Sequence, residues 1–217
     1  KRDWSSDVCS SDLLGITVPE IRKIAKKYNE IDMRELKSLI TSKFHEARFC
    51  ALAILINKFI STQNERERQK FYDFYIRQLN KGFINNWDLV DVSAPIIGQV
   101  LLREQNRQTT LRQMAKSKKL WVRRTSILFT FASLRIGETR DTLAIATLLL
   151  KDEHDLIQKA VGWALREVGK IDSRQLRAYL KKYGIAMSRT TLRYAIEKFS
   201  PTERNKWLED RKSTRLN

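Results

Sequence analysis

A tryptophan and an aspartate lie four positions apart in the segment 86–91, Asn-Trp-Asp-Leu-Val-Asp. If this segment is helical, Trp87 and Asp91 share one face of the helix. An indole beside a carboxylate can hold a sugar and stabilise positive charge on it, because the ring face and the carboxylate both attract cations. Arg124 and Trp163 are the later cationic and aromatic residues that we expect to complete such a site.

The sequence lacks the motifs of most hydrolases and kinases. It has no Gly-rich nucleotide loop, no His-Glu-x-x-His, and no Ser or Cys nucleophile with a histidine nearby. His45 and His154 are its two histidines, and neither has Cys or carboxylate neighbours at metal-ligand spacing. We therefore expect no metal site. Cys50 stands in an apolar run and is predicted to be a buried thiol, which fits a cytoplasmic protein.

Both ends of the sequence read as translated adapter DNA. Residues 3–13 translate a string that resembles a common sequencing-library adapter, and residues 210–217 translate a string within its reverse complement. We interpret residues 1–13 and 210–217 as non-native and exclude them from reasoning about the fold. The remaining residues, 14–209, are expected to form a single domain that is truncated at its N-terminus.

The chain is strongly basic, with a formal net charge of +17 from 42 Lys and Arg and 25 Asp and Glu. Residues 14–209 alone contain 37 basic and 21 acidic residues, so their formal net charge is +16. A charge of this size favours a polyanionic partner, most often nucleic acid. The alternative is a charged surface that serves solubility. No apolar stretch approaches the roughly 18 residues that span a bilayer, so no membrane partner is expected.

The sequence predicts helices almost throughout. It contains seven Gly and three Pro, and no segment alternates apolar and polar residues as a strand would. Pro19, Pro95 and Pro201 fit first-turn positions, and Ser188 and Thr202 fit caps. Helices are expected to begin near Pro19, Asp32, Phe44, Glu65, Asn86, Pro95, Arg107, Leu120, Thr139, His154, Asp172, Ser188 and Pro201.

A cation followed by an apolar face recurs near the start of several predicted helices. Arg124, Lys159 and Arg189 are separated by 35 and 30 residues, and Arg48 lies 76 residues before Arg124. The spacing resembles a helical-hairpin solenoid of HEAT type, whose repeats run on the order of 30–47 residues. In such a stack, equivalent helices line one concave surface. We therefore expect an all-α, HEAT-like solenoid with a concave basic groove that fits duplex DNA.

Four stretches of the sequence resemble the AlkD-type DNA alkylation repair glycosylases, a family built of HEAT-like repeats. The resemblance covers essentially all of residues 14–209. It is carried by Leu14-Gly15-Ile16 with Pro19, by the segment 86–91, by residues 120–129, and most specifically by residues 158–167, Gln-Lys-Ala-Val-Gly-Trp-Ala-Leu-Arg-Glu.

The resemblance implies an activity and a set of roles. Members excise cationic N3- and N7-alkylated purines from double-stranded DNA without a cofactor. By motif position, Asp91 matches the catalytic carboxylate, Trp87 and Trp163 match the tryptophans beside the sugar, and Arg124 matches a cleft arginine. Arg166 matches a cation near the DNA backbone. The resemblance also implies helices before Leu14 and a monomer without an obligate protein partner.

An alkylated purine already carries a positive charge, so it leaves as a neutral base and needs no general acid. A single carboxylate then suffices to stabilise the oxocarbenium-like sugar and orient water. A cation such as Arg124 near Asp91 would favour the ionised carboxylate. Lys159, Arg189, Arg193 and Arg48 are predicted phosphate contacts, although exposed cations on a solvated face are an alternative for each.

Other interpretations of these residues stay open at the sequence level. Trp87, Trp163 and Trp121 could be packed core aromatics, and Asp91 could pair with Arg123. Asp88 is predicted to be a structural partner rather than a catalyst. Arg124 is favoured over Arg123 for the site, and Arg123 is predicted to be solvated or to contact phosphate.

At the level of function, three classes remain. The first is an alkylpurine DNA glycosylase of base excision repair that acts through Asp91. The second is a non-catalytic helical-repeat protein that binds branched or distorted DNA. A protein-scaffolding HEAT module would also fit the repeats, but it leaves the positive charge and the grouping of Trp and Asp unexplained.

Overall fold

The computed structural model describes residues 12–213, and for residues 210–213 it describes the backbone alone. Within this range every regular element is helical, no strand occurs, and no helix is long and apolar enough to cross a membrane. The all-α prediction is confirmed, and the arrangement of successive packed helices is compatible with a helical-repeat solenoid. The interpretation of residues 1–13 and 210–217 as non-native falls largely outside the described residues and stays a prediction.

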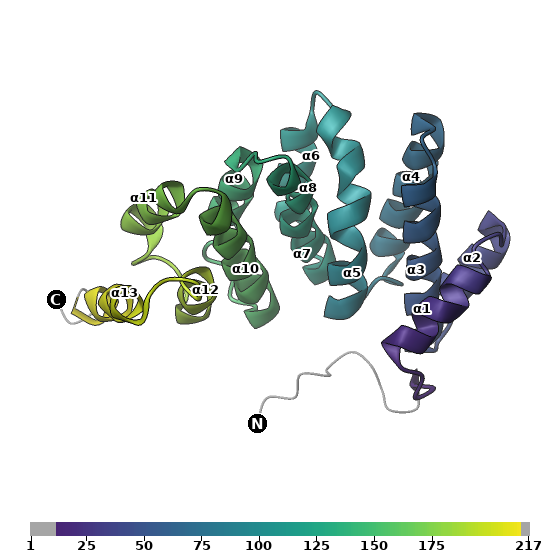
Figure 1. Cartoon of the computed structure of the whole chain (residues 1–217), viewed down its shortest axis with the longest axis horizontal. Helices are drawn as coiled ribbons and strands as arrows, with labels where there is room; N and C mark the ends of the chain where they lie inside the picture. Colours follow the sequence, from purple (N-terminus) through teal and green to yellow (C-terminus); the bar gives the residue numbers. More distant parts are fainter. Residues whose placement is uncertain (1–11, 214–217) are drawn as a thin grey trace. The chain divides into compact units, whose positions relative to one another are not determined.

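The chain divides into two compact units with the boundary between Val100 and Leu101. The first unit contains α1 (Val18–Lys27), α2 (Met33–Ile40), α3 (His45–Ser61), α4 (Glu65–Lys81) and α5 (Trp87–Ile97) (Figure 1). The central helix is α3, which packs against each of the other four. Leu52, Ile54 and Leu55 of α3 are fully buried, so this helix forms the core against which α5 is held.

The second unit is built around α10 (Asp155–Ile171). Its other elements are α6 (Arg107–Ala115), α7 (Leu120–Phe129), α8 (Phe131–Arg135), α9 (Arg140–Leu148), α11 (Ser173–Tyr183), α12 (Arg189–Ala195) and α13 (Pro201–Ser213). α10 packs against α7, α8, α9, α11 and α12 (Figure 1). Val161 and Leu165 of α10 are fully buried. The 3-10 helix η2 (Gly98–Arg103) contains the boundary between the units.

Side-chain caps explain where several helices begin. The Asn86 carboxamide oxygen accepts the N–H of Trp87 at 2.7 Å, and the Ser188 hydroxyl accepts that of Thr191 at 3.0 Å. These bonds satisfy backbone donors that have no partner inside a first helical turn. The predicted starts at Asn86 and Ser188, and the predicted cap at Ser188, are therefore confirmed.

Two details of the helix prediction are wrong. Pro95 does not begin a helix but lies inside α5, two residues before its last residue, Ile97. A proline removes one backbone donor from a helix, and the buried face of α5 holds the helix together across this interruption. Thr202 is the second residue of α13 and not its cap, because Ser200 accepts the N–H of Glu203 at 3.3 Å.

Candidate active site

Trp87 and Asp91 occupy the same face of α5, one helical turn apart. Trp87 is the first residue of the helix, and 47% of its surface is exposed, so it is not a core aromatic of the first unit. Asp91 is partly exposed. The residues between them include Leu89 and Val90, which are fully buried. α5 therefore anchors one face in the core and presents an indole and a carboxylate on another.

Asp88, the other carboxylate of this segment, is engaged within the first unit. Its Oδ2 lies 2.7 Å from Nε2 of His45 at the start of α3, and its Oδ1 accepts the N–H of Leu89 at 2.8 Å. The contact gives Asp88 a partner on another helix. Its predicted role as a structural residue rather than a catalyst stays a prediction. The role of His45 was missed, and the sequence holds no signal for it because the two residues lie 43 positions apart.

Glu46 and Arg48 are two buried charged residues in the first turn of α3, and each has its own surroundings. Oε1 of Glu46 accepts the N–H groups of Leu14 and Gly15 at 2.8 and 2.9 Å. Burial acts to raise the pKa of Glu46, but the backbone donors, led by Leu14, outweigh it and hold the pKa below its usual value. Arg48 is 8% exposed, and burial lowers its pKa against the opposing charges of Asp12 and Asp88. The role of Arg48 in DNA binding stays a prediction, and its burial leaves little surface for a phosphate.

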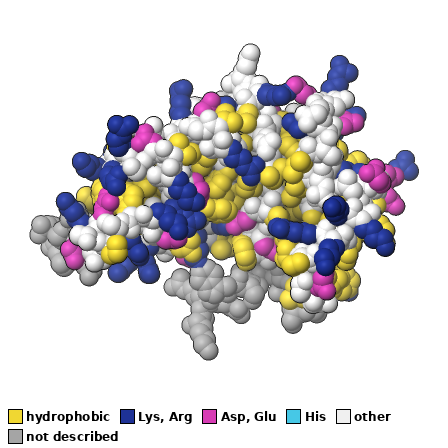
Figure 2. Space-filling model, viewed as in Figure 1, with side chains coloured by type: hydrophobic (Ala, Val, Ile, Leu, Met, Phe, Trp, Pro, Cys, Tyr) yellow, Lys and Arg dark blue, Asp and Glu magenta, His cyan; other side chains and the backbone are white. Residues whose placement is uncertain are grey.

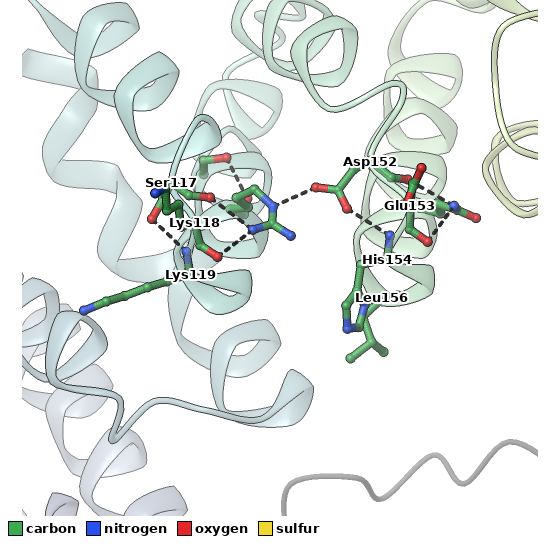
Figure 3. Close-up of polar contacts among 10 residues, drawn as sticks. Ser117, Lys118, Lys119, Asp152, Glu153, His154 and Leu156 are labelled. Atoms are coloured by element: carbon green, nitrogen blue, oxygen red, sulfur yellow. Dashed lines mark hydrogen bonds and ion pairs between the residues drawn. The ribbon is translucent and has the colours of Figure 1, made fainter.

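In the second unit, Arg124 is buried in α7 and donates from Nη1 to the carbonyl of Leu156 in the first turn of α10. It therefore joins two helices of this unit, and its role as a cleft arginine stays a prediction. The neighbouring Arg123 donates from Nε to Oδ2 of Asp152 at 2.7 Å and from Nη1 to the carbonyl oxygens of Ser117 and Lys118 (Figure 3). Arg123 is therefore not the solvated cation that was predicted, because these acceptors hold it between two loops. A contact with phosphate stays a prediction.

Trp163 lies half-buried on α10 with contacts at two edges of its indole. Nε1 donates to Oε1 of Glu167 at 3.1 Å, and the ring of Phe131 meets the indole edge-on, with centroids 4.8 Å apart and an interplanar angle of 64°. Neither partner was predicted from the sequence. The spacing of four between Trp163 and Glu167 was an available signal for the first, whereas nothing in the sequence indicates Phe131.

The predicted phosphate contacts of the second unit fall into two groups. Lys159 pairs with Asp155 at 2.8 Å, and Arg166 pairs with Glu197, so these two cations are engaged by carboxylates. Arg189 and Arg193 of α12 are exposed. Figure 2 shows Lys and Arg side chains at many places on the visible face, interspersed with acidic ones. A continuous basic groove stays a prediction.

The chemistry available to these residues is that of charge stabilisation. Within residues 12–213, no group of three or more His, Cys, Asp and Glu side chains is arranged to hold a metal ion. Cys50 is buried, as predicted, and burial raises the pKa of its thiol, which disfavours the reactive thiolate. An exposed indole with a carboxylate one turn away can attract a cationic ligand without covalent chemistry.

Comparison with known proteins decides the family. The family model described as DNA alkylation repair enzyme matches residues 10–199, which is most of the chain. The chain belongs to the DNA alkylation repair enzyme family. No curated protein matches the sequence. The predicted membership of the DNA alkylation repair family is therefore confirmed.

A solved structure shares the fold of this DNA alkylation repair family member. It is described as a predicted DNA alkylation repair enzyme from Enterococcus faecalis, and it superposes with a TM-score of 0.66 at 17% sequence identity. The match covers 86% of this chain and 88% of the other. At this identity the likeness establishes a common helical fold.

Proposed function

We propose that this protein is a DNA glycosylase that removes cationic N3- and N7-alkylated purines from duplex DNA, with Asp91 as the catalytic carboxylate. Membership of the DNA alkylation repair family supports a role on alkylated DNA. The observation that carries the finer proposal is the exposure of Trp87 on the face of α5 that also holds Asp91. A large exposed indole at a helix start has no role in the core of its own unit.

Asp91 suits the catalytic role better than Asp88. Asp88 is bound to His45 at 2.7 Å and caps the backbone beside it, so its charge serves the junction of α3 and α5. Asp91 shares its face with Trp87, one turn further along the helix. Of the two carboxylates in the motif, Asp91 is therefore the one that accompanies an exposed aromatic surface.

The proposed reaction depends mainly on electrostatic stabilisation of the positive charge that develops on the sugar. The alkylated base departs with the electrons of the N-glycosidic bond and becomes neutral, leaving positive charge on the sugar. The ionised Asp91 stabilises that charge and orients the attacking water, whose oxygen bonds to C1′ of the sugar while one of its protons passes to solvent. The family motifs assign Trp87 and, in the second unit, Trp163 to the sugar, and an indole ring face attracts a cation. The family motifs assign Arg124 to the substrate cleft and Arg166 to the DNA backbone. The other proposed phosphate contacts are Lys159, Arg189, Arg193 and Arg48.

The decisive experiment measures release of free 7-methylguanine from duplex DNA that carries N7-methylguanine. We expect the wild-type protein to release the base and Asp91→Asn to release it about 100-fold more slowly or worse, because a preorganised charge is lost. Affinity for the same DNA should change by no more than about twofold, since Asn keeps the shape and Asp91 makes no contact with phosphate in this proposal.

Two matched substitutions separate catalysis from fold. Asp73→Asn removes one carboxylate from the exposed surface of α4 and should leave release unchanged. Asp88→Asn weakens the contact with His45, so it should lower the thermal midpoint of unfolding. If the wild-type protein binds DNA but releases no base, the protein is a non-catalytic DNA-binding repeat protein and the glycosylase proposal is wrong.

A further inference from the structure

Trp163 is held by a carboxylate of its own helix. The indole Nε1 donates to Oε1 of Glu167 at 3.1 Å, one turn along α10, while Phe131 of α8 packs edge-on against the ring at 4.8 Å. A tryptophan side chain has two main torsions, and a hydrogen bond at one edge with packing at another fixes both. The plane of this indole is therefore set by neighbours within the second unit.

Glu167 is itself held in place by cations. Nζ of Lys170 lies 2.8 and 2.7 Å from its two carboxylate oxygens, and Nε of Arg166 lies 3.5 Å from Oε1. Arg166 also pairs with Glu197 of the segment that follows α12. The Glu167 side chain is 21% exposed, so its contacts are partly shielded from water. These cations orient the carboxylate and compensate its charge.

An ionised acceptor does more for an indole than a neutral one. A charge-assisted hydrogen bond is shorter and stronger than a neutral one, and it polarises the N–H bond toward the ring. The ring gains electron density, and its face then attracts a cation more strongly. An oriented indole with an anionic partner is therefore better suited to hold positive charge than a tryptophan that is only packed.

We propose that Glu167 is a positioning residue for the excision reaction: it fixes the plane of Trp163 and strengthens the attraction of that indole for the cationic sugar. The inference rests on the proposed glycosylase function. It assigns no contact with substrate to Glu167, which acts through Trp163. It also divides the effect of Glu167 into an orienting part, which any acceptor can supply, and a charge part, which needs the carboxylate.

Two substitutions measure the two parts. Glu167→Gln keeps an oxygen acceptor for Nε1 and removes the charge, whereas Glu167→Ala removes both. Under single-turnover conditions with N7-methylguanine duplex DNA, we expect the release rate to fall about 3- to 10-fold in Glu167→Gln, in line with the strength of a cation–π contact, and further in Glu167→Ala. Affinity for the DNA should stay within about twofold in Glu167→Gln. Glu153→Gln, which removes one charge from an exposed site of the same unit, should match wild type.

A second measurement needs no substrate. The indole N–H signal of Trp163, identified in NMR spectra by its loss in Trp163→Phe, should exchange slowly with solvent in the wild type. It should stay protected in Glu167→Gln and exchange faster in Glu167→Ala. Equal protection in wild type and Glu167→Ala would overturn the orienting part, and a wild-type release rate in Glu167→Gln would overturn the charge part. If the wild-type protein releases no base, the proposed glycosylase function is wrong, and the role of Glu167 in excision is wrong with it. If the wild type is active, the two substitutions test the role of Glu167 alone.

Discussion

Carboxylates of similar chemistry take different roles in this molecule because their partners differ. Asp88 is bound to a histidine, Glu167 to an indole and two cations, and Glu46 to backbone N–H groups. Asp91 shares a helix face with an exposed tryptophan. The residue type alone does not specify these roles, because the donors bound to Asp88, Glu167 and Glu46 differ.

Glu46 provides a pH-dependent prediction at this scale. Its pKa is lower in the folded protein than in the unfolded chain, so the stability it contributes is present above the unfolded value of about 4.3 and is lost as the pH falls through the folded pKa. We expect the amides of Leu14 and Gly15 to lose hydrogen-exchange protection in that acidic range. The measurement is exchange at pH 7 and pH 3, with rates corrected for intrinsic exchange.

The matched variant for this prediction is Glu46→Gln, which keeps one acceptor oxygen without charge. Its amides at residues 14 and 15 should be less protected at pH 7, by about 10-fold, because hydrogen bonds to a charged acceptor are the stronger ones. Protection in this variant should also change little between pH 7 and pH 3. Wild-type protection that persists unchanged down to the lowest pH at which the protein stays folded would contradict the assignment.

The candidate site could be predicted from the sequence only where its residues are close along the chain. Trp87 and Asp91 are four apart on one helix, and so are Trp163 and Glu167, so a period of 3.6 residues suffices to pair them. His45 with Asp88, and Phe131 with Trp163, are contacts between different helices. Such contacts depend on how helices pack, which the pattern of a single sequence does not specify.

At the scale of elements, helix starts were predictable because caps act locally. Asn86, Asp172 and Ser188 each accept a backbone N–H within the next three residues. Pro95 shows the limit of local rules. A proline favours a first turn, yet the buried residues on both sides of it keep α5 continuous to Ile97. Tertiary packing overrides local preference at this position.

The crossing of α10 and α12 gives a prediction about packing. A Cβ added at Gly162 would lie 2.4 Å from Cβ of Tyr194 and 2.7 Å from the carbonyl oxygen of Thr191, neither of which can move without shifting α12. We expect Gly162→Ala to cost about 3 kcal/mol, the upper end of the overpacking range, which exceeds the roughly 1 kcal/mol gained in helix propensity. The measurement is the thermal midpoint, which should fall by several degrees, on the order of 2–4 °C per kcal/mol.

Gly169 offers a matched control on the same helix. A Cβ there would lie 2.5 Å from Cδ2 of Leu176, the end of a flexible side chain that can rotate away. Gly169→Ala should therefore leave the midpoint within about 2 °C of wild type, because the gain in propensity offsets a small repacking cost. Equal effects of the two substitutions would mean that Gly162 is not needed for the close approach of the helices.

At the scale of the whole molecule, the net charge of +17 predicts binding to duplex DNA that weakens as salt rises. Arg189 and Arg193 lie four apart on α12 and are exposed, so they are the clearest candidates for phosphate contacts in the second unit. Replacing both with Gln should weaken binding for all sequences and lower the slope of log K against log salt by about 2.

The charge-matched control for this prediction replaces two exposed lysines of α1, Lys23→Gln with Lys26→Gln. It lowers the net charge equally but should leave the slope nearly unchanged, since the slope counts phosphates contacted and not total charge. Titrations at a series of salt concentrations distinguish the variants. Equal slopes of log K against log salt in the wild type and both double variants would show that α12 does not contact DNA phosphates. An affinity that does not depend on salt would favour a protein-scaffolding repeat over a DNA-binding protein.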